Sequence, residues 1–486
     1  MFMLLGCFYA KADDDLITQQ ITVEVSEPGT LCNIISNSKK NRITNLKLKG
    51  KLNVSDIQFI REMADCYCGI NWNWFLSGGN LEKLDISEAE FVGNKKFDAV
   101  YRADGGYCRS NEASFCENAI GKYCFSYLLK LKKIILPNCV TSIGESAFEN
   151  CSSLASVGIP SGVTSIGEDA FRNCSSLASV EIPSSVTSIG RSAFYDCSSL
   201  ASVEIPSGVT SIVAYTFCGC SSLASVEIPS SVTRIGIYAF VNCSSLASVE
   251  IPSSVTRIGE GAFSCCSSLA SVEIPSSVTS IEDDTFYGCS SLASVEIPSS
   301  VTSIGWAVFR DCSSLASINI PDGVTSIGDD AFYGCSSLAS VEIPSSVTSI
   351  KESTFSGCSS LTSVEIPSSV TSIEESAFSG CSSLASVYSY GTNPPTLGSG
   401  VFDNLTLKNG ILHVPAGSWQ SYWLSNWGDF EHIVEFDPTG IENVKIQTNA
   451  MKTSRYTLDG KRLNAPTSGV NIVKYNDGTV KKVLEK

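Results

Sequence analysis

The chain has 486 residues, of which 43% are hydrophobic and 17% are charged, and this composition indicates a folded protein rather than a disordered one. Its formal net charge of −16 disfavours nucleic acid and anionic membrane surfaces as partners. Between Cys151 and Tyr388 there are 22 Asp or Glu against 6 Lys or Arg, so the net acidity belongs to that segment.

Residues 1–12 have features of an export signal. The apolar run from Met1 to Ala10 is followed by an A-x-A box ending at Ala12. A lipoprotein box at LLGC (residues 4–7) and an ordinary apolar N-terminus are the alternatives. No other stretch approaches the ~18 apolar residues of a membrane span. We therefore predict an exported protein without a membrane span.

Residues 13–104 are predicted to form an N-terminal cap region. The stretch VSDIQFIREMAD (residues 54–65) has helical spacing, and LEKLDIS (residues 81–87) is predicted to begin a series of strands. A cap is needed because the end of a stacked array would otherwise expose an apolar surface.

Residues 105–388 form an array of 23-residue units, weaker at its start and without insertions or deletions from Cys151 onward. The copy CSSLASVEIPSSVTSIG begins at Cys174. Its Leu177, Val180 and Ile182 follow the L-x-x-L-x-L pattern of the strand in a leucine-rich repeat. Eleven cysteines mark the register: Cys151, Cys174, Cys197, Cys220, Cys243, Cys266, Cys289, Cys312, Cys335, Cys358 and Cys381.

The rest of each unit completes one turn of a solenoid. Pro183 ends the first strand because it cannot donate to a ladder, and residues 186–189 suit a second short strand. Gly190 permits a turn, and Ala193 with Phe194 suits a short helical or 3₁₀ turn that fills the interior. The predicted fold is a β-rich leucine-rich-repeat solenoid with N-terminal and C-terminal caps and a small C-terminal β module.

The repeat cysteines are interpreted as small buried residues whose thiols face loop carbonyls. Eleven is an odd number, and an in-register stack makes their Cβ vectors parallel, which disfavours disulfides among them. Four metal ligands cannot converge from one straight row. Outside the row, Cys108 can pair with Cys116 or Cys124, whereas Cys66 with Cys68 is sterically awkward.

The residue between Val and Ile in the first strand points away from the core, because side chains alternate along a strand. Stacking places neighbouring carboxylates about 5 Å apart, an arrangement that is destabilising unless solvent, divalent cations, raised pKa values or a basic partner relieve it. This position is Gly158 and Asn319 in two copies, and it is glutamate in eight, which we call the glutamate row: Glu181, Glu204, Glu227, Glu250, Glu273, Glu296, Glu342 and Glu365.

Two interpretations of the glutamate row remain open. The row can form a binding surface, shaped for an extended protein or glycan. Alternatively, it keeps an exposed sheet soluble and discourages aggregation, with recent duplication copying one glutamate many times. The aromatic residues near the Ala-Phe pair are likewise either contact residues or products of neutral drift: Tyr195, Tyr215, Tyr238, Tyr287, Trp306 and Tyr333.

No arrangement of residues indicates catalysis. The two histidines, His413 and His432, lie in the segment that closes the array, without partners for a triad or zinc site. Phosphate-binding loops, nucleophile elbows and zinc-protease helices are missing from the sequence. Paired carboxylates of a glycosidase need a shaped cleft, which a straight repetitive sheet does not readily offer. We predict that the protein is not an enzyme.

Residues 389–437 are predicted to form the C-terminal cap. Trp419, Tyr422, Trp423 and Trp427 are spaced like one packed helical face, with a sugar-binding platform as the alternative. Residues 438–486 form a linker and a small β tail with hairpin turns at its two Asp-Gly pairs. This tail serves export or attachment, or is a small accessory module.

The string C-S-S-L-x-S-V-x-I-P-x-x-V-x-S-I-G-x-x-A-F resembles the repeat of BspA-like bacterial surface proteins over residues 105–388. The flanking segments, including LHVPAGSWQSYWLSNWGDFEHIVEF (residues 412–436), are similar to the ends of those proteins, and the tail resembles those of exported proteins from Bacteroides-type bacteria. The resemblance implies display on the cell surface and binding to host matrix and plasma proteins.

Together, the residues and the resemblance predict a secreted or cell-surface, outer-membrane-associated protein, an adhesin that binds host extracellular proteins or glycoproteins through its array. We expect a monomer with no cofactor, apart from a divalent cation that the glutamate row can attract. The alternatives are a structural surface-layer or spacer protein without a specific ligand and, third, a carbohydrate-processing enzyme.

Overall fold

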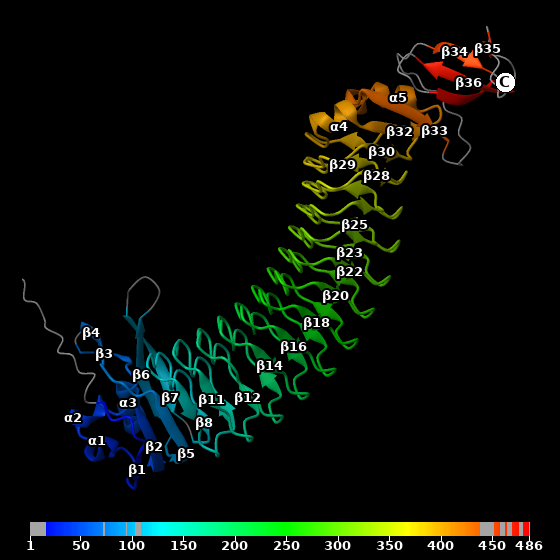
Figure 1. Ribbon diagram of the computed structural model, residues 1–486. Helices are drawn as coiled ribbons and strands as arrows, with labels where there is room; N and C mark the ends of the chain where they lie inside the picture. Colours follow the sequence, from blue (N-terminus) through cyan, green and yellow to red (C-terminus); the bar gives the residue numbers. More distant parts are fainter. Residues whose placement is uncertain are drawn as a thin grey trace, which may run out of the picture. The chain divides into compact units, whose positions relative to one another are not determined.

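The computed structural model describes residues 16–70, 73–93, 95–102, 108–115, 117–437, 452–456, 462–463, 469–475 and 480–485 (Figure 1). The predicted signal (residues 1–12) and the Pro-Thr-Gly linker (residues 438–440) lie outside the described residues. The chain divides into two compact units, Met1–Leu269 and Ala270–Lys486. Each unit is a β-solenoid of leucine-rich repeats, as predicted.

The first unit begins with a parallel sheet whose strand order is β1-β2-β5-β9-β11. This sheet starts earlier than predicted, because two strands precede residues 81–87. Helix α3 (Val54–Met63) lies where helical spacing predicted it, and Asn53 and Asp56 form a capping box at its N-terminus. The other elements are β1 (Ile21–Val25), α1 (Leu31–Ile34), α2 (Asn37–Lys40), β2 (Asn45–Leu52), β5 (Lys83–Phe91), β9 (Lys133–Ile135), β11 (Ser156–Gly158) and two hairpins, β3 (Tyr67–Ile70) with β4 (Asn73–Leu76) and β6 (Lys95–Arg102) with β7 (Cys108–Phe115).

Each later repeat of the first unit contributes two short parallel strands, one to each of two sheets. The strands with sequence Ser-Val-Glu are β14 (Ser202–Glu204), β16 (Ser225–Glu227) and β18 (Ser248–Glu250). The second sheet is divided into a four-stranded part and a three-stranded part. The first part contains β8 (Ala119–Ile120), β10 (Ser142–Ile143), β12 (Ser165–Ile166) and β13 (Ser188–Ile189), and the second contains β15 (Ser211–Ile212), β17 (Arg234–Ile235) and β19 (Arg257–Ile258).

The second unit repeats this arrangement and then closes it. Its first sheet is divided into three hydrogen-bonded parts. They are β20 (Ser271–Glu273) with β22 (Ser294–Glu296), β24 (Ser317–Ile318) with β26 (Ser340–Val341), and β28 (Ser363–Ile366) with β30 (Ser386–Ser389), β32 (Ile411–Pro415) and β33 (His432–Phe436). The second-sheet strands are β21 (Ser280–Ile281), β23 (Ser303–Ile304), β25 (Ser326–Ile327), β27 (Ser349–Ile350), β29 (Ser372–Ile373) and β31 (Thr396–Leu397). The closing segment adds α4 (Asn404–Asn409), α5 (Trp419–Trp423) and the 3₁₀ helix η2 (Asn426–Asp429).

The predicted C-terminal β module is an antiparallel sheet of order β35-β34-β36-β37. The hairpin pairings predicted from the two Asp-Gly pairs are present, although the turn residues themselves lie outside the described residues. Its strands are β34 (Lys452–Tyr456), β35 (Arg462–Leu463), β36 (Gly469–Tyr475) and β37 (Val480–Glu485).

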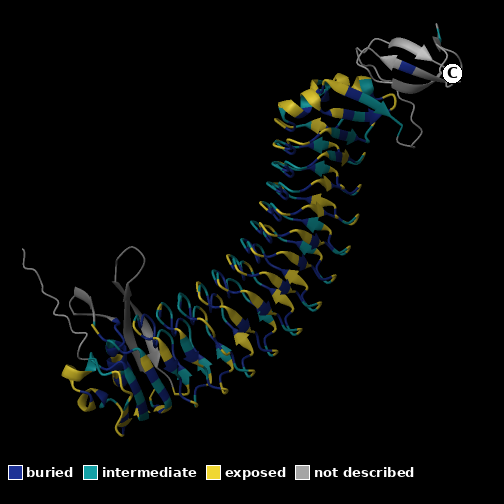
Figure 2. Cartoon of the chain, viewed as in Figure 1, coloured by how far each residue is buried: buried dark blue, intermediate teal, exposed yellow. Residues whose placement is uncertain are grey.

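The interior of each repeat holds the residues that the pattern assigned to it. In one rung Phe194, Cys197 and Leu200 are fully buried, and Val203 and Ile205 are nearly so. Equivalent phenylalanines stack from rung to rung with centroid separations of 5.2 to 5.5 Å in the first unit. Figure 2 shows this alternation of buried and exposed positions along the short strands. The stacked rings provide the continuous core that a single repeat cannot form.

The Ala-Phe segment forms a run of tight turns with an alternating hydrogen-bond pattern. The N–H groups of Ala193 and Tyr195 donate to carbonyls three residues back, and the N–H groups of Phe194 and Asp196 donate to the next rung. This alternation places Asp196 in the left-handed region, with φ of 53°. The position before each ladder cysteine is therefore Asn, Asp or Gly, which tolerate that conformation, in every copy from Asn150 onward except one.

Candidate functional site: an acidic strand face

The glutamate row lies on the outer face of the first sheet in each unit. In the first unit Glu204 is in register with Glu227, and Glu227 with Glu250. The valine before each glutamate is buried while the serine and glutamate around it are exposed, because side chains alternate along the strand. Glu181 is exposed in the rung before them. The predicted outward stacking of carboxylates is thus present.

The second unit has its own glutamates in the same position. Glu273 is in register with Glu296, and Glu342 pairs with Glu365 through an isolated bridge. All four side chains are exposed, and Asn319 takes the intervening position. The row in this unit therefore consists of two pairs of neighbouring carboxylates, separated by Asn319.

A groove runs beside the glutamate row in the first unit. Its volume is about 560 Å³, and it is lined by Glu181, Glu204 and Glu227 together with prolines and isoleucines that follow them in each rung. A second groove of about 420 Å³ lies against the same three glutamates and the serines two residues before them. The row thus forms the shared edge of two grooves, one partly apolar and the other lined by hydroxyl groups.

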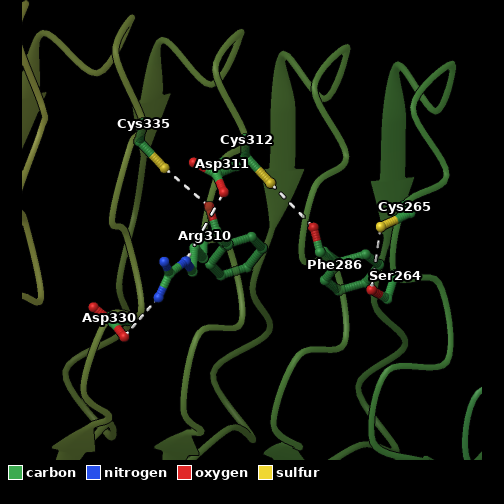
Figure 3. A network of polar contacts seen from close by, with 9 residues as sticks. Ser264, Cys265, Phe286, Arg310, Asp311, Cys312, Asp330 and Cys335 are labelled. Atoms are coloured by element: carbon green, nitrogen blue, oxygen red, sulfur yellow. Dashed lines mark hydrogen bonds and ion pairs between the residues drawn. The ribbon is translucent and has the colours of Figure 1, made fainter.

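No lysine or arginine among the described residues forms an ion pair with the glutamate row. The ion pairs of the repeats use other carboxylates: Arg310 Nη1 lies 2.8 Å from Asp330 (Figure 3), and Lys351 Nζ lies 2.7 Å from Glu374. In the described parts of the chain, no three His, Cys, Asp or Glu side chains are grouped to hold a metal ion. The structure therefore gives no basis for a cation bound at the row.

At the end of the second unit, the glutamate column continues as two aromatic residues that the sequence analysis did not assign to it. Glu365 is in register with Tyr388, and Tyr388 with His413. The Tyr388 and His413 rings stack at 4.1 Å, and Tyr390 donates its hydroxyl to Glu365 at 3.1 Å. Burial lowers the pKa of His413, which keeps the ring neutral. Tyr388 stands 23 residues after Glu365, so the repeat period could have identified it.

The repeat thiols point at main-chain carbonyls, as the sequence predicted. The Cys312 thiol donates to the Phe286 carbonyl at 3.2 Å (Figure 3). The Cys335 thiol likewise donates to the Phe309 carbonyl at 3.1 Å. Burial raises the pKa of Cys151 to about 12, which disfavours the reactive thiolate. These thiols are structural groups. Cys108 and Cys116, considered above for disulfides, have no described side chains.

The aromatic residues near the Ala-Phe pair do not gather into one site. Tyr195, Tyr215 and Tyr238 are half-buried and neighbour one another in the first unit, with the Tyr215 and Tyr238 rings 5.4 Å apart. The Arg172 guanidinium lies 4.6 Å from the Tyr195 ring centroid, so the chain itself covers part of this face. Trp306 is 44% exposed in the other unit.

The aromatic residues of the C-terminal cap are divided between core and surface. Tyr422 and Trp427 are fully buried, and their rings meet edge to face at 5.6 Å. Trp419 stacks on Trp423, which remains 51% exposed. The first pair is packed in the core, but Tyr422 lies in α5 and Trp427 in η2, so the two residues do not share one helical face as predicted.

The model of the BspA type leucine-rich repeat region, with six copies, matches residues 118–243, 210–322 and 307–427. These ranges cover more than half of the chain. The chain belongs to the BspA-type leucine-rich-repeat family. The repeats and the fold of this family are typically non-catalytic. In the described parts of this BspA-type protein, no helix is long and apolar enough to cross a bilayer.

Solved structures of bacterial leucine-rich-repeat proteins are similar to this BspA-type chain. A leucine-rich repeat protein from Bacteroides ovatus is 28% identical, with 70% of this chain and 90% of that chain covered and a TM-score of 0.48. A leucine rich cell surface protein from Faecalibacterium prausnitzii is 26% identical, with 80% and 90% covered and a TM-score of 0.42. A leucine rich repeat protein from T. pallidum is 32% identical, with 39% and 80% covered and a TM-score of 0.28. Curated proteins give no match to the chain.

Proposed function

We propose that this protein is an exported cell-surface adhesin whose glutamate row binds host matrix or plasma proteins. The observation that carries the proposal is the row itself. Glu204, Glu227 and Glu250 stand in register on an exposed face, and none of them has a basic partner among the described residues. Like charges on adjacent strands repel each other and destabilise the fold. A basic partner would relieve this repulsion, and that relief would favour binding.

The shape of the two grooves favours a partner that lies along the row. The prolines on one side offer apolar contacts, and the serines on the other side offer hydroxyl groups. An extended peptide carrying Lys or Arg at regular intervals matches this combination, and a glycoprotein can present such a segment. Membership of the BspA-type family and the apolar N-terminal run support export. Outer-membrane association is part of the proposal and rests on the resemblance of the tail.

The test compares two variants with equal charge changes. One carries Glu204→Gln, Glu227→Gln and Glu250→Gln. The control changes three exposed glutamates of the turns to glutamine: Glu168, Glu352 and Glu375. Both variants keep side-chain volume and should fold alike.

Binding of each purified variant to a panel of purified host matrix and plasma proteins is measured by biolayer interferometry, with and without chelator. We expect the row variant to lose about tenfold in affinity for the partner that the parent binds, since each exposed charge contact contributes only about 0.5 kcal/mol. The control should bind as the parent does. Equal binding by the parent and both variants would refute the claim that the glutamate row is the binding surface. Weak, salt-sensitive binding to every protein in the panel would favour a spacer without a specific ligand.

A further inference from the structure

The second sheet of the first unit carries two arginines at a position that is serine elsewhere in the repeats. Arg234 in β17 and Arg257 in β19 are in register with each other and exposed. They follow Ser211 in β15, which has the usual side chain. The other copies have serine here: Ser142, Ser165, Ser188, Ser280, Ser303, Ser326, Ser349 and Ser372.

The neighbouring column changes close by, and one of its changes lies in the rung of Arg234. Three residues after each of these serines, the chain has Glu145 and Glu168 in earlier rungs and Glu260 in a later one. Between them the position is Arg191, Ala214 and Ile237. The acidic column is therefore interrupted in three successive rungs, those of Ser188, Ser211 and Arg234. It resumes in the rung of Arg257.

All of these replacements except Arg191 line one groove. Its volume is about 320 Å³, and its lining includes Val213, Ala214 and Ile237 as well as Arg234 and Arg257. Ile237 is 43% exposed, which makes it one of few large apolar side chains on the described surface. The groove is basic and apolar in a unit whose repeats are otherwise acidic and polar.

Neither Arg234, through an ion pair, nor the exposed Ile237 side chain, through core packing, stabilises the fold among the described residues. Two arginines directly opposite on adjacent strands repel each other, whereas the serine of the other copies would be neutral there. Arg234 forms no ion pair with any residue that the structure describes. An exposed isoleucine adds no core packing. A ligand that supplies carboxylates and an apolar side chain would turn each of these features into a favourable contact.

We propose that this groove binds a short acidic segment of a partner protein, with carboxylates on Arg234 and Arg257 and an apolar side chain over Ile237 and Val213. Alternate residues of an extended segment are about 6.6 Å apart, and adjacent strands are about 4.8 Å apart, a difference that flexible arginine side chains can span. Glu260 follows in the rung of Arg257, and the exposed Ile237 side chain favours a segment that also carries an apolar side chain over a sulfated glycan. The site is distinct from the glutamate row and has the opposite charge preference.

The experiment uses the full chain and three fluorescein-labelled octapeptides in fluorescence anisotropy. The probe alternates Glu with Leu, and the comparison peptides alternate Glu with Ser or Lys with Leu. We expect the Glu-Leu peptide to bind more tightly than the other two. The double variant Arg234→Ser and Arg257→Ser should weaken that binding at least about tenfold, because two charge-assisted contacts are lost.

Both substitutions restore the residue that the other copies have, so the variant should fold like the parent. A second variant, Ile237→Glu, restores the acidic column and should also weaken binding. The glutamate-row variant described above should bind the Glu-Leu peptide no less well than the parent. The proposal is overturned if the Glu-Leu peptide does not bind, if the double variant binds it unchanged, or if a heparin oligosaccharide binds at this groove and the peptide does not.

Discussion

The buried cysteine ladder should make the array unusually sensitive to alkali. In the first unit, burial raises the pKa of the ladder thiols above their ordinary value of 9.0, to about 12 for Cys151. The same direction holds for Cys174, Cys197, Cys220 and Cys243. Above pH 9 the unfolded chain therefore loses protons that the folded chain retains, so the free energy of unfolding falls as pH rises toward 12.

The size of the effect follows from the number of thiols. At pH 10 a thiol with an unfolded pKa near 9 contributes a loss of about 1.4 kcal/mol if it stays protonated in the fold. These five thiols alone would lower the free energy of unfolding of the first unit by about 7 kcal/mol, which is comparable to the whole stability of many domains. Below pH 9 the contribution of these thiols is fully present.

Guanidinium unfolding followed by circular dichroism at pH 8 and pH 10, with a reductant present, measures this loss. The matched control is the variant Cys197→Ala with Cys220→Ala, in which three of the five thiols remain and the alkaline loss should fall to about 4 kcal/mol. Tyrosine ionisation is common to both proteins and cancels in the comparison.

At pH 8 a disulfide reagent should label exposed Cys32 and leave the ladder unmodified. An alkaline loss that is equal in both proteins, or rapid labelling of the ladder, would refute the reasoning.

Three further substitutions and one control test contacts in the rungs and at helix α3 by their melting temperatures. Gly190→Ala should cost about 1–3 kcal/mol because its Cβ would clash with the main-chain nitrogen of Glu168, whereas Gly208→Ser, which matches most other copies, should change stability little. Cys265→Gly should stabilise by about 1 kcal/mol because this cysteine has φ of 58°. Asp56→Ala should cost about 2–3 kcal/mol because the buried carboxylate accepts three main-chain N–H groups. The argument for a position would be contradicted if Gly190→Ala left the melting temperature unchanged, if Cys265→Gly lowered it, or if Asp56→Ala left it unchanged.

The repeat made most of the array predictable from the sequence. A strict 23-residue period forces equivalent residues into register, so Leu200, Val203 and Phe194 could be assigned to the core and Glu204 to the surface. The thiol of Cys197 could be assigned to a carbonyl because a small buried residue at that place has few other partners. These predictions concern positions that every rung shares, and each position has the same surroundings from one rung to the next.

The features that were missed depend on departures from the repeat or on backbone conformation. The alternating turn bonds around Phe194 follow from left-handed residues such as Asp196, and periodicity of apolar residues does not report φ. The groove beside Arg234 is formed by side chains from neighbouring rungs, and its chemistry appears only when the columns are read across copies. Tyr388 keeps the 23-residue spacing from Glu365, whereas His413 extends the glutamate column because the closing strand keeps its register after the spacing has changed to 25 residues.

The most direct test of the account is the affinity of the parent and the Glu204→Gln, Glu227→Gln, Glu250→Gln variant for one host matrix or plasma protein that the parent binds saturably. The account predicts a loss of about tenfold in the variant, with the turn-glutamate control unchanged. Equal affinity in all three proteins would contradict the claim that the glutamate row is the binding surface.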